Sequence, residues 1–261
     1  MSTSDPVLIT DKTDGILRLT INRPARRNAL NDDLIVELDQ AFAAAGHDPD
    51  VRVIILGAVG DKAFCAGADL NPNAGTFGFD YAEPTTTYAN LLRTARKTPV
   101  PVIARVNGFC LAGGMGLLAI SDLAVASDNA KFGLPEVKVG LFPMQVAALM
   151  QTMLPPRKFA EMCYTGEMLD AAAALECGLV NYVVGMDDLD STVDDLAAKI
   201  AQNSPAAIKR GKHALTAMHG MTFEQGIAYM EAQVGLMPLT EDAQEGLAAF
   251  AEKRAPQWTG R

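Results

Sequence analysis

Two adjacent glycines, Gly113 and Gly114, lie between a predicted buried strand over 100–106 and a predicted apolar helix over 115–120. A helix N-terminus exposes backbone N–H groups and favours negative charge. Because neither glycine carries a Cβ atom, a ligand can approach this backbone closely. The stretch therefore predicts a site for a ligand that is anionic, or that becomes anionic during a reaction.

Two other interpretations of these glycines compete with an anion site. Gly114, Gly116 and Ala119 match the spacing of a dinucleotide-binding fingerprint. Seven residues separate Val106 from Gly114, whereas the fingerprint requires a tight turn directly after the strand, which argues against this interpretation. The second alternative is that the glycines only allow close packing of the helix.

Composition limits the classes of partner. The chain has 261 residues, of which 20% are charged and 49% are apolar, so it is long enough for one large α/β domain or two smaller ones. Its formal net charge of −9 argues against nucleic acid or an anionic membrane as the main partner. No apolar run reaches the length of a transmembrane helix. An anionic small ligand would need a local cluster of Lys and Arg.

The cysteines and histidines indicate neither disulfides nor a metal site. The four cysteines have no paired spacing and no secretory signal is visible, so we expect reduced thiols in a cytoplasmic protein. The three histidines have no metal-ligand grouping and are interpreted as ordinary surface or helix residues. These residues are Cys65, Cys110, Cys163, Cys177, His47, His213 and His219.

Strands and helices are predicted to alternate up to about residue 185, which indicates an α/β fold with parallel strand pairing. Leu17, Leu19 and Ile21 alternate with polar residues and predict the second strand of a hairpin. Asn31 is the expected N-cap of the following helix. The expected elements are a hairpin over 7–10 and 15–22, helices over 32–46 and 84–97, and strands over 51–56 and 123–126.

Two further segments have more than one interpretation. Residues 71–83 have no hydrophobic period and are expected to form a long loop, either a pocket lid or a mobile excursion. Beyond residue 186 the chain is predicted to be helical. Five aspartates crowd the start of one of these helices, and complementarity to the helix dipole explains them better than metal binding. They are Asp187, Asp188, Asp190, Asp194 and Asp195.

Several short motifs occur in a characteristic order. They are Asn22-Arg23-Pro24, Asn28-Ala29-Leu30, Phe64-Cys65-Ala66-Gly67-Ala68-Asp69, Val106-Asn107-Gly108, Ala112-Gly113-Gly114, Phe132-Gly133-Leu134-Pro135-Glu136 with Gly140, Gly178-Leu179-Val180, and the stretch 250–254. Together they resemble the enoyl-CoA hydratase/isomerase family, also called the crotonase superfamily. The resemblance implies an α/β spiral of repeated ββα units over 1–185 and a helical region over 186–261 that builds homotrimers or homohexamers.

The resemblance also implies the chemistry of the site. The family binds an acyl-CoA thioester and holds its carbonyl oxygen with two backbone N–H groups, which by motif position belong to Ala68 and Gly113. Glu136 would be the acid/base. No separate cofactor is implied, because coenzyme A is part of the substrate, and no metal is expected.

Binding of the substrate and its CoA moiety is assigned by motif position. Arg26 and Arg27 lie where the family places basic contacts to CoA phosphates. Lys253 and Arg254 are expected to reach the ligand of a neighbouring subunit, although each of these residues could be an ordinary surface charge. The Asp69 side chain could equally be a cap, and the lysine usual after this segment is replaced by Asn71 and Pro72. The expected set is Ala25, Arg26, Arg27, Ala66, Ala68, Asp69, Leu70, Gly114 and Lys253.

One departure from the family pattern affects the predicted reaction. Family hydratases use two glutamates, and the first falls at Gly116, which has no side chain. Adding water to a double bond usually requires two carboxylates, whereas moving a double bond needs one base. We therefore expect isomerisation of an enoyl-CoA with Glu136 alone. The alternatives are a hydratase or other enolate-forming lyase using Asp80, Tyr81 or Glu83, and a non-catalytic acyl-CoA-binding protein.

Overall fold

Two β-sheets form the body of the protein, which the computed structural model describes over residues 5–71, 82 and 85–261. The larger sheet has the strand order β1-β2-β3-β5-β7-β10, and the smaller has the order β4-β6-β8-β9. The strands are β1 (Leu8–Thr13), β2 (Ile16–Ile21), β3 (Val53–Ala58), β4 (Ala63–Cys65), β5 (Val102–Val106), β6 (Phe109–Leu111), β7 (Leu123–Ser127), β8 (Lys131–Gly133), β9 (Met168–Asp170) and β10 (Tyr182–Val184).

Ten α-helices and four short 3-10 helices are found in the described residues. The α-helices are α1 (Asp32–His47), α2 (Thr87–Lys97), α3 (Gly113–Ala119), α4 (Met144–Met150), α5 (Pro156–Thr165), α6 (Ala171–Glu176), α7 (Leu189–Ala201), α8 (Pro205–Met218), α9 (Phe223–Leu236) and α10 (Glu241–Glu252). The 3-10 helices are η1 (Pro24–Arg26), η2 (Pro135–Val139), η3 (Met186–Asp188) and η4 (Met237–Leu239). The mixed α/β class expected from the sequence is confirmed.

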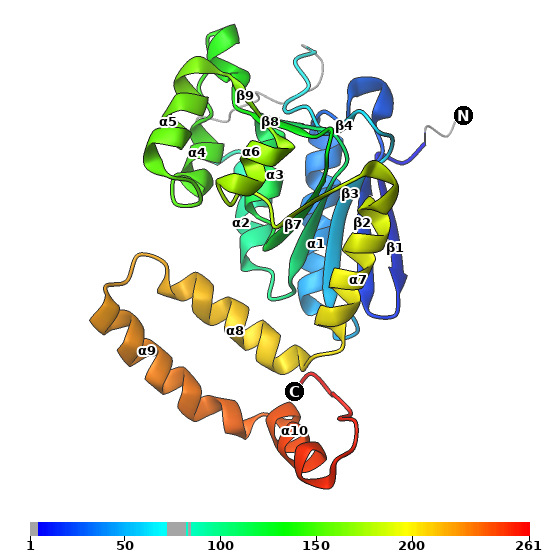
Figure 1. Ribbon diagram of the computed structural model, residues 1–261, viewed down its shortest axis with the longest axis vertical. Helices are drawn as coiled ribbons and strands as arrows, with labels where there is room; N and C mark the ends of the chain where they lie inside the picture. The colour runs from blue at the N-terminus through cyan, green and yellow to red at the C-terminus, as the bar shows by residue number, and fades with distance from the viewer. Residues whose placement is uncertain (1–4, 72–81, 83–84) are drawn as a thin grey trace.

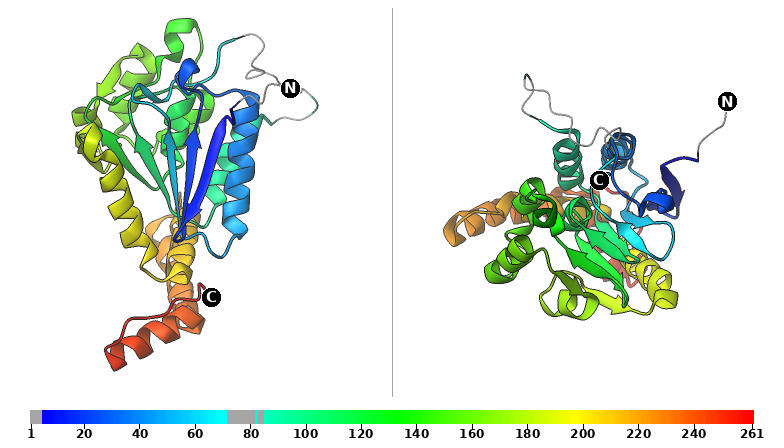
Figure 2. Two further views of the ribbon diagram at one scale, coloured as in Figure 1. Left: turned by 90° about the vertical axis from the view of Figure 1, so that its right-hand side faces the viewer. Right: turned by 90° about the horizontal axis from the view of Figure 1, so that it is seen from above.

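The larger sheet lies between α1 on one face and α7 on the other (Figures 1 and 2). All six residues of β3 are buried, because both faces of this central strand are covered. The expected hairpin is present, with β1 antiparallel to β2, whereas β2, β3, β5, β7 and β10 run parallel. Asn31 is the N-cap of α1, as predicted, since its side chain accepts a hydrogen bond from the Leu34 N–H.

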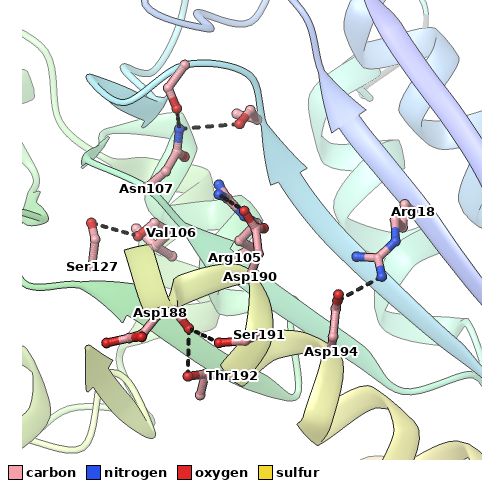
Figure 3. Close-up of polar contacts among 12 residues, drawn as sticks. Arg18, Arg105, Val106, Asn107, Ser127, Asp188, Asp190, Ser191, Thr192 and Asp194 are labelled. Carbon is pink, nitrogen blue, oxygen red and sulfur yellow. Dashed lines mark hydrogen bonds and ion pairs between the residues drawn. The ribbon is translucent and has the colours of Figure 1, made fainter. Parts of the chain in front are cut away.

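The acidic start of α7 pairs with arginines that project from the sheet (Figure 3). Arg105 from β5 contacts Asp190 at 2.5 Å, and Arg18 from β2 contacts Asp194 at 2.7 Å. The hydrogen bond from Arg105 lowers the pKa of Asp190. Two of the five aspartates thus attach the helix to the sheet, a role beyond the helix-dipole complementarity expected from the sequence.

Helices α8, α9 and α10 extend away from the two sheets at one end of the molecule (Figures 1 and 2). Large apolar side chains on them are exposed, including Phe223 at 77%, Val234 at 71%, Leu247 at 69% and Phe250 at 86%. Within the described part of the chain, no helix combines the length and apolar character needed to cross a bilayer.

Candidate active site

A cavity of about 510 Å³ opens between α1, α2, the start of α3, η2 and α4. Its walls are mostly apolar side chains, with a few polar groups among them. Apolar pockets with a small number of placed polar groups are the usual form of ligand sites. Three of the lining residues are Ala68, Gly113 and Glu136, which come from separate segments of the chain and which the sequence analysis assigned to one site.

The backbone around Ala68 is extended and pairs with Leu30 as an isolated parallel bridge. The Leu30 N–H donates to the Gly67 carbonyl at 2.8 Å, and the Asp69 N–H donates to the Leu30 carbonyl at 2.7 Å. N–H groups of successive extended residues point to opposite sides. The Ala68 N–H therefore points away from Leu30, and it donates to no partner among the described residues.

The turn before α3 packs directly against this extended segment. A Cβ atom built on Gly67, whose φ is +96°, would lie 2.6 Å from the Ala112 Cβ and 3.4 Å from the Gly113 nitrogen. Ala112 itself has φ 50°, a conformation that costs a non-glycine residue of order 1–3 kcal/mol. This unusual turn starts α3, and the Gly113 N–H at its first position has no acceptor in the described chain.

Glu136 is the cavity's carboxylate. It lies in η2, which starts at Pro135 and ends at Gly140 with φ 78°, and the Leu141 N–H donates to its carbonyl at 3.0 Å. Burial raises the pKa of Glu136 above its ordinary value of 4.5. Its buried Oε2 atom has no hydrogen-bond partner among the described residues. A half-buried carboxylate with a raised pKa and a free oxygen is suited to accept a proton from a ligand.

Arg23 holds the segment that contains Ala68, a role the sequence analysis did not assign. Its guanidinium donates to the Ala29 carbonyl and contacts Asp69 Oδ2 at 2.9 Å. The hydrogen bond from Arg23 lowers the pKa of Asp69. The Asp69 side chain is only 11% exposed, and its Oδ1 accepts a hydrogen bond from the Asn71 N–H at 3.1 Å.

Asn28 supports the same loop from inside the protein. It is 1% exposed, and its amide nitrogen donates to the Val59 and Ala63 carbonyls at 3.1 and 2.7 Å. Its amide oxygen accepts from the Arg23 N–H at 3.0 Å. Asn28 has φ 55°, and the only sign of its role in the sequence was its place in the Asn28-Ala29-Leu30 motif.

Tyr88 was also missed and lines the cavity from α2. Its hydroxyl donates to the Gly113 carbonyl at 2.5 Å. Tyr88 precedes the buried Leu91 and Leu92 by three and four residues, so helical spacing placed it on the inward face of its helix.

The residues expected to bind substrate differ in whether they line the cavity. Ala66, Ala68 and Leu70 line the cavity, and Leu70 is 62% exposed at its edge. Gly114 does not line it. A Cβ on Gly114 would overlap the Cys65 carbonyl oxygen, so this glycine permits close packing of α3 on β4.

Ala25 and the basic residues expected near CoA lie outside the cavity wall. Ala25, Arg26 and Arg27 are exposed around η1, and Arg26 is close enough to Asp69 for its charge to lower the Asp69 pKa. Lys253 ends α10, which lies at the opposite end of the molecule from α3 and α4 (Figure 1). A contact from Lys253 to CoA would therefore have to come from another subunit.

Other sequence expectations concern the loop and the metal-ligating residue types. Asp80, Tyr81 and Glu83, the alternative acids, lie outside the described residues. All four cysteines are free thiols, and burial raises the pKa of Cys65 to about 12. No cluster of metal-ligating side chains occurs in residues 5–71, 82 and 85–261.

Comparisons with known proteins give a consistent result. The model of the family described as "Enoyl-CoA hydratase/isomerase" matches residues 11–261. The chain is 37% identical to "Enoyl-CoA hydratase domain-containing protein 3, mitochondrial" of Xenopus laevis, over 97% of this chain and 86% of that protein. It is 35% identical to "(E)-benzylidenesuccinyl-CoA hydratase" of Thauera aromatica, over 93% and 94% of the two chains.

The fold is matched equally well by solved structures. The crystal structure of an enoyl-CoA hydratase from Bacillus anthracis superposes with a TM-score of 0.90 at 30% identity, covering 98% of this chain and 100% of that one. Sequence and fold thus agree over nearly the whole length. The chain belongs to the enoyl-CoA hydratase/isomerase family.

Proposed function

We propose that this acyl-CoA enzyme moves the double bond of an enoyl-CoA from position 3 to position 2 through a thioester enolate. The carrying observation is the composition of the cavity. Glu136 is its one carboxylate among the described lining residues, Ala68 and Gly113 line the same cavity, and their N–H groups donate to no acceptor in the described chain. One base and two convergent donors suffice for a proton shift next to a thioester.

In the proposed reaction, the Glu136 carboxylate removes a proton from C2 of the 3-enoyl thioester. The electron pair moves into the enolate, whose oxygen the two N–H groups stabilise. The protonated Glu136 then delivers the proton to C4, the double bond forms between C2 and C3, and the carboxylate is regenerated. Each oxyanion donor of this kind contributes about 3–4 kcal/mol of transition-state stabilisation.

The CoA moiety of the bound substrate is proposed to extend out of the cavity past Leu70 and η1. Arg26 and Arg27 form no ion pair within the described residues, so both are available to phosphates. Lys253 is proposed to contribute from a neighbouring subunit of a homotrimer or homohexamer, because α10, which ends at Lys253, lies at the opposite end of the molecule from α3 and α4 (Figure 1).

Hydration is the second candidate, and the comparisons favour it. The relatives from Thauera aromatica and Bacillus anthracis both carry hydratase names. Against it stands Gly116, which offers no second acid/base at its position.

Parallel incubation of the pure protein with a 3-enoyl-CoA and a 2-enoyl-CoA separates the two reactions. The proposal predicts conversion of the first substrate to 2-enoyl-CoA and little hydration of the second. In D₂O, part of the hydrogen removed from C2 should appear at C4, since a single shielded base carries it. Fast hydration without isomerisation would overturn the proposal.

A further inference from the structure

Tyr88 occupies the space into which a side chain at position 116 would project. A Cβ atom built on Gly116 would overlap the Tyr88 hydroxyl and lie 3.1 Å from its Cζ atom. Gly116 does not line the cavity, whereas Tyr88 does, so the phenol stands between the glycine and the ligand space. Position 116 has no side chain, yet the space beside it is not empty, because Tyr88 from α2 fills it.

A hydrogen bond holds the Tyr88 hydroxyl against α3. The hydroxyl donates to the Gly113 carbonyl at 2.5 Å, and a Cβ atom built on Gly116 would also lie 3.4 Å from Val146 Cγ2. The ring joins the first turn of α3 to α2. A phenol held in this way keeps its own proton on a backbone carbonyl and does not present it to a ligand.

Tyr88 also cannot replace a carboxylate as a base. Burial raises the pKa of Tyr88 well above its ordinary value of 10, and the nearby Glu136 carboxylate acts in the same direction. The phenol thus stays neutral at physiological pH. Its effect on the reaction must come from the volume it fills and from the contact with Gly113.

We propose that Tyr88 is a specificity-determining residue that fills the region beside Gly116 and so keeps an activated water from the double bond. Protons are then handled by Glu136 alone, which favours isomerisation over hydration. This inference rests on the proposed function. It differs from a packing role in its consequence, because a packing residue would affect both reactions alike.

The test compares hydration and isomerisation rates of the wild-type protein, Tyr88→Phe and Tyr88→Ala. Tyr88→Ala opens the space, and the ratio of hydration to isomerisation should rise about tenfold, below the 10²–10⁴-fold that a positioned acid–base group contributes, because the variant adds no second carboxylate. Tyr88→Phe keeps the ring and loses the bond to Gly113. It should slow both reactions with the ratio unchanged within about twofold. Tyr182→Ala, in β10, is the matched control and should leave the ratio as it is.

A second variant protects the test against unfolding. If Tyr88→Ala does not fold, Tyr88→Leu still removes the hydroxyl end of the side chain and is measured in its place. Adding Gly116→Glu to the opened variant should raise hydration further, whereas Gly116→Glu alone should clash with Tyr88.

The outcomes separate failure of the Tyr88 proposal from failure of the proposed function. A wild-type protein that isomerises, combined with an unchanged ratio in folded Tyr88→Ala or Tyr88→Leu, would overturn the role of Tyr88 only. A wild-type protein that hydrates and does not isomerise would overturn the proposed function, and the inference with it.

Discussion

Gly67 and Ala112 approach so closely that a Cβ atom on Gly67 would lie 2.6 Å from the Ala112 Cβ. This approach brings the extended segment of Ala68 against the turn that starts α3. The two N–H groups proposed to bind the thioester oxygen come from these two segments. Their spacing therefore depends on the absence of a side chain at position 67.

Gly67→Ala should separate the two segments and lower kcat. Loss of one oxyanion donor typically costs 10²–10³-fold in kcat, so we expect a decrease of about that size. Gly178→Ala is the matched control, because Gly178 has φ +77° but its Cβ would meet nothing within 4 Å. Both variants carry the backbone strain of a left-handed alanine, and only Gly67→Ala should lose activity. Equal kcat in the two would contradict the geometry.

Arg23→Ala should destabilise the protein through the loss of two contacts of its guanidinium. The Ala29 carbonyl and the Asp69 carboxylate both lose a charged donor, and such a hydrogen bond contributes about 1.5–3 kcal/mol. Urea unfolding measures the change in free energy of unfolding. Lys158→Ala, which breaks the exposed pair with Glu161, should cost under about 1 kcal/mol. Similar losses in the two variants would show that Arg23 does not hold the loop.

Activity should depend on pH through Glu136. The base works only when ionised, and burial raises its pKa above 4.5, so kcat/KM should rise with pH with its midpoint above 4.5. A pH–rate profile of kcat/KM measures this midpoint. A midpoint at or below 4.5 would show that the carboxylate is not buried in the working enzyme.

The same raised pKa predicts an effect on stability. A raised pKa in the folded state makes the wild-type protein lose stability as pH rises from the unfolded to the folded value. Glu136→Gln cannot ionise, so its free energy of unfolding should exceed that of the wild type at pH 7 and match it more closely near pH 4. Chemical unfolding at the two pH values gives the comparison. The prediction would be wrong if the stability advantage of Glu136→Gln over the wild type were smaller at pH 7 than at pH 4.

Assembly is expected to cover the exposed apolar surface of the C-terminal helices. Leu247 and Phe250 of α10 are 69% and 86% exposed, and Val234 and Leu239 are 71% and 72% exposed. Large exposed apolar surfaces mark sites of protein–protein contact. Light scattering should give a trimer or hexamer, and Phe250→Glu should shift the protein to smaller species. A monomeric wild-type protein at micromolar concentration would refute this expectation.

Local signals in the sequence predicted much of the fold and part of the site. Asn31 and the apolar spacing of α1 are local features, as is the alternation of β2, and all three were found. The positions of Ala68, Gly113 and Glu136 followed from motifs, and the structure places them on one cavity.

The features that could not be predicted from the sequence depend on contacts between segments that are far apart in the chain. Tyr88 reaches Gly113 across 25 positions, and Arg23 reaches Asp69 across 46. Arg105 and Asp190 are 85 positions apart. Periodicity identifies the inward face of a helix but not the residue it meets, so the side chain that fills the space beside Gly116 could not be identified before the helices were placed.

The most direct measurement of the central claim is turnover of 3-enoyl-CoA by Glu136→Gln. Calorimetry of the same variant gives its affinity for the product, 2-enoyl-CoA. The amide keeps the shape of the side chain and cannot carry the proton. Turnover should fall by at least about 10²-fold, with Kd unchanged within about threefold. Glu161→Gln, an exposed carboxylate on α5, is the control and should keep full activity. Turnover of Glu136→Gln at the wild-type rate would remove Glu136 from the reaction.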